Sequence, residues 1–206
     1  QTEARVFNAY DSTTRTYAGN STYTTLTIAS ETNDPSNQFN TATYKATIAN
    51  SGYYNVYGVI NYYLESTGAA TGVSDTRVNL QLYHTPNGSP FSNVLNGNFQ
   101  DFSWFPTGAG QTATSGDIYL ATGNVYLGQG DVIELKIWSL TNNTIVAPHN
   151  IKVTDVVFEN SVVNSGLVSG NTVDYNQAIP PNIKQKDFLT SLIKMFNLYV
   201  DVDKDN

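Results

Sequence analysis

The sequence predicts an all-β fold, an antiparallel sandwich or barrel, over about its first 160 residues. Runs of alternating apolar and polar residues recur about every ten to twenty positions, turn residues separate them, and no helical period lies between them. Hydrophobic residues make up 40% of the chain, enough for a core, whereas charged residues make up only 13%. The surface must therefore consist largely of Ser, Thr, Asn and Gln.

The expected strands differ in how strictly their residues alternate. The run 77–85 places Val78, Leu80 and Leu82 on one face of a strand, with polar residues between them. The run 52–64, GYYNVYGVINYYL, is apolar on both faces in part, which predicts a strand covered on both sides there. Further strands are expected at 21–30, at 41–49, as a pair within 116–140 around a Gly-Gln-Gly-Asp turn, and at 150–163.

The longest irregular stretch, 93–116, is predicted to be a loop, and long loops in compact domains usually carry a function or an interface. It contains the aromatic cluster FQDFSWFP. We expect Phe102, Trp104 and Phe105 to hold a sugar ring, with Asp101 or Asn98 accepting hydroxyl protons. The alternative is that these aromatic residues close the end of the sandwich or form a subunit interface, because aromatic residues in β proteins mostly serve packing.

The chain changes character after residue 163, which divides it into a sandwich at 1–163, a linker at 164–182 and a short helix-strand appendage at 183–206. Adjacent prolines at the end of the linker favour extended backbone. The expected helix is apolar along one stripe, and a helix of about ten residues is marginal alone in water, so the stripe is predicted to dock on a partner. Its residues are Phe188, Leu189, Leu192, Ile193 and Phe196.

Three segments of the sandwich resemble, in order and spacing, the jelly-roll domain shared by tumour-necrosis-factor and complement globular-head proteins. They are NQFNTATYKATIANSGYYNVYGVINYY (37–63), RVNLQLYHTPNGSP (77–90) and NVYLGQGDVIELKIWS (124–139). The resemblance implies an antiparallel jelly roll and a homo-oligomer, frequently a trimer packed through aromatic residues. It does not imply catalysis.

The segment IPPNIKQKDFLTSLIKMFNLYVDVD, about 179–203, resembles part of the tail-hub or baseplate structural proteins of bacteriophages. The resemblance implies that the sandwich is an accessory domain of a larger particle protein. The residues that carry it are Pro181, Ile183, Lys184, Gln185, Asp187, Phe188 and Leu189.

Charge and composition argue against several classes of function. The net charge is −7, and ten scattered Lys and Arg residues do not form the basic patch that nucleic acid requires. No apolar run is long enough for membrane insertion, and the chain contains no Cys. His84 and His149 stand outside metal-ligand spacings and are expected at loop or surface positions, so neither metal nor cofactor is predicted. The acids available to a glycan hydrolase are also explained as strand-end residues: Glu65, Asp75, Asp101, Asp117 and Glu134.

These observations predict a non-enzymatic structural component of a phage particle, associated with a tail hub, baseplate or fibre. It is expected in the virion, where it assembles with copies of itself and with other structural proteins and contacts a host-surface glycan. The alternative is a secreted or surface-displayed carbohydrate-binding or adhesion module, which would be extracellular or on a bacterial cell surface.

Overall fold

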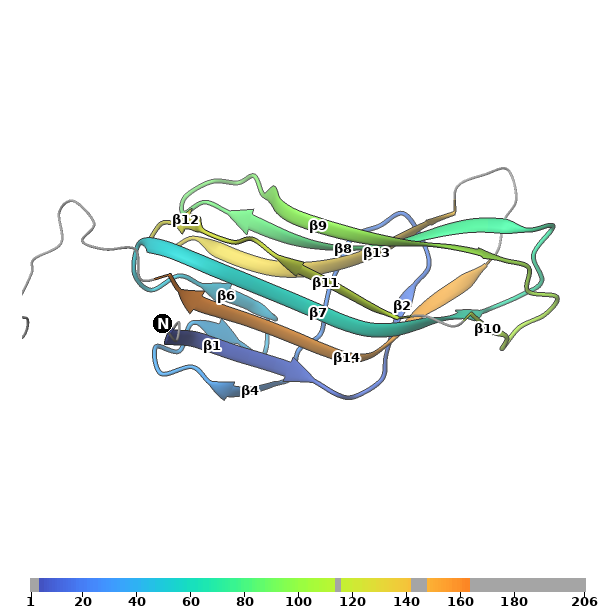
Figure 1. Cartoon of the computed structure of the whole chain (residues 1–206), viewed down its shortest axis with the longest axis horizontal. Coiled ribbons are helices and arrows are strands. Elements are labelled where there is room, and N and C mark those ends of the chain that lie inside the picture. Colours follow the sequence, from blue (N-terminus) through green and yellow to red (C-terminus); the bar gives the residue numbers. More distant parts are fainter. Residues whose placement is uncertain (1–3, 114–115, 142–147, 164–206) are drawn as a thin grey trace, which may run out of the picture. The chain divides into compact units, whose positions relative to one another are not determined.

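The computed structural model describes residues 4–113, 116–141 and 148–163. All regular structure within these residues is strand, arranged in two antiparallel sheets that face each other (Figure 1). The predicted all-β jelly-roll sandwich is therefore confirmed. The described part of the chain contains no helix that could cross a membrane.

The first sheet is built around two long neighbouring strands, β7 (Gly52–Ser66) and β14 (His149–Val162). Beyond β14 lie β1 (Ala4–Asp11), β2 (Arg15–Ala18) and β4 (Ser30–Asn33). Along the other edge of β7, three short strands pair with successive parts of it: β10 (Thr112–Ala113), β11 (Asp117–Ala121) and β12 (Val125–Leu127).

The second sheet is centred on β8 (Ser74–Thr85) and β13 (Val132–Thr141). Strand β9 (Asn93–Trp104) pairs with β8 and forms one edge. The other edge of β13 carries β3 (Thr24–Thr25) and β6 (Lys45–Thr47), and β5 (Phe39–Asn40) lies beyond β6.

The chain crosses repeatedly between the two sheets. It passes from β7 to the hairpin β8–β9 in the second sheet, returns to β11 and β12, crosses to β13, and ends in β14 next to β7. This order places strands that are distant in sequence side by side, and it gives each outer face a mixture of early and late residues.

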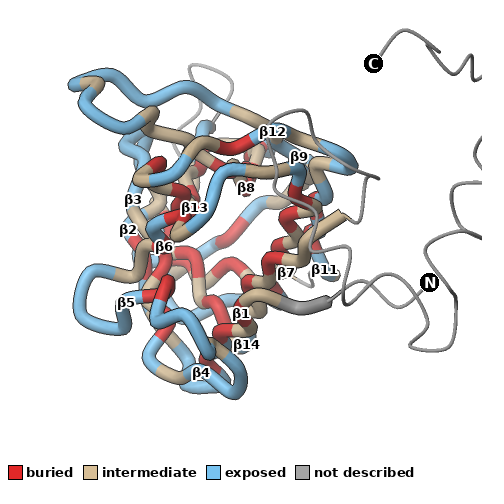
Figure 2. The backbone as a smooth tube through the Cα atoms, turned by 90° about the vertical axis from the view of Figure 1, so that its left-hand side faces the viewer, coloured by how far each residue is buried: buried red, intermediate tan, exposed pale blue. Residues whose placement is uncertain are grey.

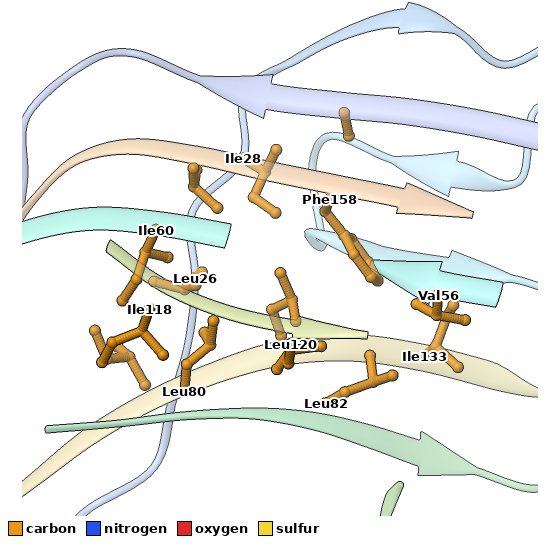
Figure 3. Packing of buried hydrophobic residues seen from close by; sticks show 14 of the residues in the cluster. Leu26, Ile28, Val56, Ile60, Leu80, Leu82, Ile118, Leu120, Ile133 and Phe158 are labelled. Carbon is orange, nitrogen blue, oxygen red and sulfur yellow. The ribbon is translucent and has the colours of Figure 1, made fainter. Parts of the chain in front are cut away.

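Alternation along the strands creates the core between the sheets. Val56 and Ile60 on β7 and Leu80 and Leu82 on β8 point inward and are fully buried (Figure 3). Buried positions of the two sheets face each other across the sandwich in Figure 2. At Gly58 a Cβ atom would lie 2.9 Å from a methyl group of Leu135, so the close approach of the sheets there favours glycine.

The expected strands at 52–64, 77–85 and 150–163, and the pair around the Gly-Gln-Gly-Asp turn, are confirmed as β7, β8, β14 and the β11–β13 region. The strands expected at 21–30 and 41–49 are much shorter, because only β3 and β6 within them pair with β13. The outward residues of β7 are only partly covered, so cover on both faces is incomplete.

The prediction of a loop over 93–116 is wrong, because β9 occupies its first half and pairs with β8 along almost its whole length. Its pattern is obscured because several inward positions are polar. Asn96 donates to the Ala121 carbonyl oxygen at 2.6 Å, and Asn98 donates to the Tyr119 carbonyl oxygen at 2.8 Å. These asparagines link the edge of one sheet to β11 at the edge of the other.

The same two side chains also cover the free edge of β9. The Asn96 side-chain oxygen accepts from the Gly97 N–H at 2.7 Å, and the Asn98 oxygen accepts from the Phe99 N–H at 2.9 Å. Edge strands with unpaired N–H groups invite pairing with other chains. The asparagine pair, Asn96 and Asn98, therefore closes this side of the sandwich.

The predicted linker at 164–182 and the helix-strand appendage at 183–206 lie outside the described residues. The same holds for the predicted docking stripe from Phe188 to Phe196. These remain predictions.

Candidate functional site

The three residues predicted to bind a ligand do not form one exposed aromatic surface. Phe102 packs edge-on against Tyr62 with 5.9 Å between ring centroids, and the indole N–H of Trp104 donates to Thr76 Oγ1 at 3.3 Å. Trp104 also contacts the His149 ring. Only Phe105 is strongly exposed, at 52%. Sugar binding by this trio stays a prediction, and the contacts of Phe102 and Trp104 are those of residues that close the end of the sandwich.

The outer face of the first sheet carries most of the exposed tyrosines. The register aligns Tyr119 on β11, Val59 on β7, Val157 on β14 and Tyr10 on β1 in one row across four strands. Tyr119 is 62% exposed and Tyr10 is 38% exposed. We call this row, together with the neighbouring Tyr53 and Tyr126, the tyrosine face.

Polar pairs border the tyrosine face, but its central row carries no charge. Asn8 donates to Glu159 at 2.9 Å on one side of the row, and Asn61 donates to Asp117 at 2.7 Å on the other. Tyr53 and Tyr126 pack edge to face at 5.4 Å between centroids. A shallow hollow of about 170 Å³ beside the row is lined by Val59, Asn61, Asp117, Asp155, Val156 and Val157.

The outer face of the second sheet combines aromatic rings with ion pairs. Arg77 makes two parallel bonds to Asp101, at 2.7 and 2.8 Å, and its guanidinium lies 3.9 Å from the centroid of the Phe99 ring. Lys136 lies over Tyr83 in the same manner, at 4.4 Å. These two cations are therefore held over aromatic rings.

Glu134 anchors the edge of that face and is 97% buried, with 3% of its surface exposed. It accepts a hydrogen bond from Thr25 Oγ1 at 2.7 Å and forms ion pairs of 3.3 Å with Lys45 and Lys136. Burial acts to raise the pKa of Glu134, but the Thr25 hydrogen bond and the two lysines outweigh it and hold the pKa below its ordinary value. Glu134 is thus a structural anion.

Asp131 plays the corresponding role at the turn between β12 and β13. Its carboxylate accepts from the backbone N–H groups of Asn87 and Gly128, each at 2.8 Å, and pairs with His84 Nε2 at 2.7 Å. Burial acts to raise the pKa of Asp131, but these hydrogen bonds and His84 hold it below the ordinary value. The predicted Gly-Gln-Gly-Asp turn, residues 128–131, is therefore tied to the loop that follows β8.

The expectation that both histidines occupy loop or surface positions is wrong. His149 is 4% exposed and bonds Ser139 Oγ at 2.8 Å, and His84 pairs with the buried Asp131. The partner of His84 is 47 residues away, and Ser139 comes to face His149 only because β13 and β14 lie in different sheets of the fold. Among the described residues, no group of three His, Cys, Asp or Glu side chains could hold a metal ion.

Three of the acids considered for glycan hydrolysis are held in ion pairs. Glu65 pairs with Lys152 at 2.8 Å, Asp101 with Arg77, and Glu134 with two lysines. The general acid of a glycosidase is a carboxyl group with a raised pKa, which donates a proton to the leaving group. A carboxylate held in an ion pair with a lysine or arginine does not fit that role.

Comparison with known proteins finds similarity to solved structures only. No protein-family model and no curated protein matches the chain. Solved structures of tumour-necrosis-factor and complement type do match. The likeness is one of fold.

The globular domain of zebrafish complement 1qA protein matches at 14% identity and a TM-score of 0.44, over 80% of this chain and 100% of that one. The Eiger TNF from S. frugiperda matches at 14% identity and a TM-score of 0.49, over 82% and 100%. Murine APRIL, solved at pH 5.0, matches at 13% identity and a TM-score of 0.41, over 72% and 98%.

Proposed function

We propose that this protein is a non-enzymatic structural component of a phage particle, and that its jelly roll associates with copies of itself through the tyrosine face. The tyrosine face is the observation that carries the proposal. Two exposed rings, Tyr119 and Tyr10, lie at the ends of a row whose middle positions are Val59 and Val157, so the row is apolar between them. Tyrosine supplies large contact area at low entropic cost. Tyrosine and other aromatic residues are enriched in interfaces between proteins.

The distribution of charge favours a second copy of the chain as the partner that binds the tyrosine face. The chain carries a net charge of −7, so copies repel each other over most of their surface. The central row of the tyrosine face is uncharged, so two copies can meet along it with the bordering carboxylates, Glu159 and Asp117, at the margin of the contact. The resemblance to tumour-necrosis-factor and complement domains implies a homo-oligomer packed through aromatic residues, with a trimer as the expected state.

The phage context rests on the resemblance of residues 179–203 to tail-hub and baseplate proteins. In that setting the sandwich is displayed from the particle, and the apolar stripe from Phe188 to Phe196 docks on a neighbouring structural domain. A host-surface glycan is a further contact of the displayed sandwich.

The test is the oligomeric state of the full chain, measured by sedimentation equilibrium over a range of concentrations. Tyr119→Asp places a charge in the middle of the row, and we expect it to weaken self-association at least tenfold. Phe91→Asp is the matched control, because Phe91 is 75% exposed in the loop after β8 and lies outside the tyrosine face. A monomeric parent chain, or equal effects of the two substitutions, would contradict the proposal.

The second candidate function is a secreted or surface-displayed carbohydrate-binding module. The observation that favours it is a polar hollow on the outer face of the second sheet, beside Phe99. Such a module would bind glycan without needing self-association, so the sedimentation experiment distinguishes the two functions.

A further inference from the structure

The hollow on the outer face of the second sheet has the size of a small ligand site, about 380 Å³. The strand register brings its walls together: Asp75 lies opposite Ser103, Arg77 lies opposite Asp101, and Leu140 of β13 lies on the other side of Arg77. Three neighbouring strands therefore supply the lining: Asp75 and Arg77 from β8, Asp101, Phe102 and Ser103 from β9, and Leu140 from β13.

Several polar groups in the hollow remain available to a ligand. The two bonds between Arg77 and Asp101 use Nε and Nη2 of the guanidinium, which leaves Nη1 to donate. Each Asp101 oxygen retains a lone pair. Asp75 and Ser103 make no side-chain hydrogen bond or ion pair within the described part of the chain. Acceptors and donors thus alternate around one small space.

These polar groups are fixed in place before any ligand arrives. The bidentate bond holds Arg77 and Asp101 in one plane, and the Phe99 ring supports the guanidinium from 3.9 Å. The hydrogen bond from Arg77 lowers the pKa of Asp101, which keeps this carboxylate ionised as an acceptor. Preorganised groups lose little entropy on binding, so even a shallow site of this kind can hold a ligand.

Apolar surface and charge narrow the class of ligand. Leu140 is 36% exposed in the hollow, and Phe99, 51% exposed, lies next to Arg77. Both offer surface to the C–H face of a sugar ring. Two carboxylates face one guanidinium, so the lining carries a net negative charge and disfavours acidic sugars, sulfates and phosphates.

We propose that this hollow binds a neutral glycan residue. Hydroxyl groups of the sugar donate to Asp75 and Asp101 and accept from Arg77 Nη1. The apolar face of the sugar ring lies against the side chains of Leu140 and Phe99. The inference rests on the glycan contact within the proposed function, and it uses a different face from self-association. It moves the glycan contact from the aromatic trio of Phe102, Trp104 and Phe105 to the outer surface of β8 and β9.

The test begins with the full chain on a printed array of neutral and acidic glycans. The affinity for the best neutral glycan is then measured by calorimetry for the parent and for Asp75→Ala, which breaks no bond of the folded chain. We expect at least a tenfold loss. Glu31→Ala, an exposed carboxylate on β4 of the other sheet, is the matched control and should leave the affinity unchanged.

Three outcomes would overturn the proposal: no glycan bound by the folded parent chain, preference for acidic glycans, or unchanged affinity in both Asp75→Ala and Phe99→Ala. Near-ultraviolet circular dichroism verifies that each variant is folded. Sedimentation of Asp75→Ala separates this inference from the proposed self-association, because its oligomeric state should equal that of the parent. Failure of glycan binding with intact self-association, or the reverse, identifies which of the two ideas is wrong.

Discussion

Asp131 illustrates how single carboxylates organise this charge-poor chain. One side chain satisfies two backbone N–H groups and His84, and thereby joins the loop after β8 to the turn before β13. Asp11 and Glu134 act similarly, since each accepts bonds from a neighbouring hydroxyl or N–H group and faces a cation. The few charged residues of the described chain thus include several that hold the fold together.

These carboxylates predict how stability depends on pH. In Asp11, Asp131 and Glu134 burial acts to raise the pKa, but hydrogen bonds and cations lower it below the ordinary value. A folded-state pKa below the unfolded value contributes stability that is present above the unfolded pKa, near 4, and is lost as pH falls through the folded pKa. We expect the free energy of unfolding in urea to be steady from about pH 7 to pH 5 and to fall below about pH 4.

Asp131→Asn tests whether Asp131 contributes to this loss of stability in acid, because the substitution keeps the shape of the side chain and removes its titration. Its unfolding free energy should fall less steeply with acid than that of the parent between about pH 4 and pH 2. Asp117→Asn, at an exposed carboxylate with one bond to Asn61, is the matched control. A slope in Asp131→Asn identical to that of the parent would show that Asp131 does not contribute.

At the scale of elements, β9 separates what the sequence can predict from what it cannot. The strands β7, β8, β13 and β14 were predictable because apolar residues occupy successive inward positions along the middle of each strand, although polar residues take inward positions near their ends. In β9 the inward Asn96 and Asn98 reach the carbonyl oxygens of β11, a strand that follows it in the chain. The polar pattern of β9 has a tertiary cause, so no local rule reveals it.

The asparagine pair should have a measurable effect on β9. Asn96→Ala combined with Asn98→Ala removes both links to β11 and uncovers two edge N–H groups, so we expect a loss of about 1–2 kcal/mol in the free energy of unfolding. Hydrogen exchange at Gly97 and Phe99 should become faster. Asn93→Ala, on the same strand but without a link to β11, is the control. Equal exchange in the double variant and the parent would contradict the role given to the pair.

At the scale of the whole molecule, the faces of the sandwich were harder to predict than its strands. The tyrosines were visible in the sequence, yet only the register of β11, β7, β14 and β1 brings Tyr119 and Tyr10 into one row. The hollow near Arg77 likewise depends on three strands that meet only in the folded chain. By contrast, the prediction that Phe102 and Trp104 form a binding surface depends on the prediction of a loop where β9 lies.

The predicted division of the chain implies that the sandwich, residues 1–163, folds independently of the residues that follow it. In the full chain, Phe188→Asp or Leu192→Asp should abolish docking of the predicted stripe on its partner domain and leave the thermal unfolding of the sandwich unchanged. The measurement is calorimetric unfolding combined with hydrogen exchange of β7 and β14. A chain ending at residue 163 should give the same exchange pattern. Loss of that pattern on truncation would show that residues 1–163 do not fold by themselves.

The asparagine pair also constrains the kind of assembly this molecule can enter. Because the Asn96 and Asn98 side chains occupy the N–H groups of Gly97 and Phe99, a second chain that added a strand along the middle of β9 would find these two donors already taken. This disfavours extension of the sheet along β9, whereas a contact between equivalent faces of two copies can close around a symmetry axis. The asparagine pair thus works against one route to open-ended filaments, the addition of strands along β9.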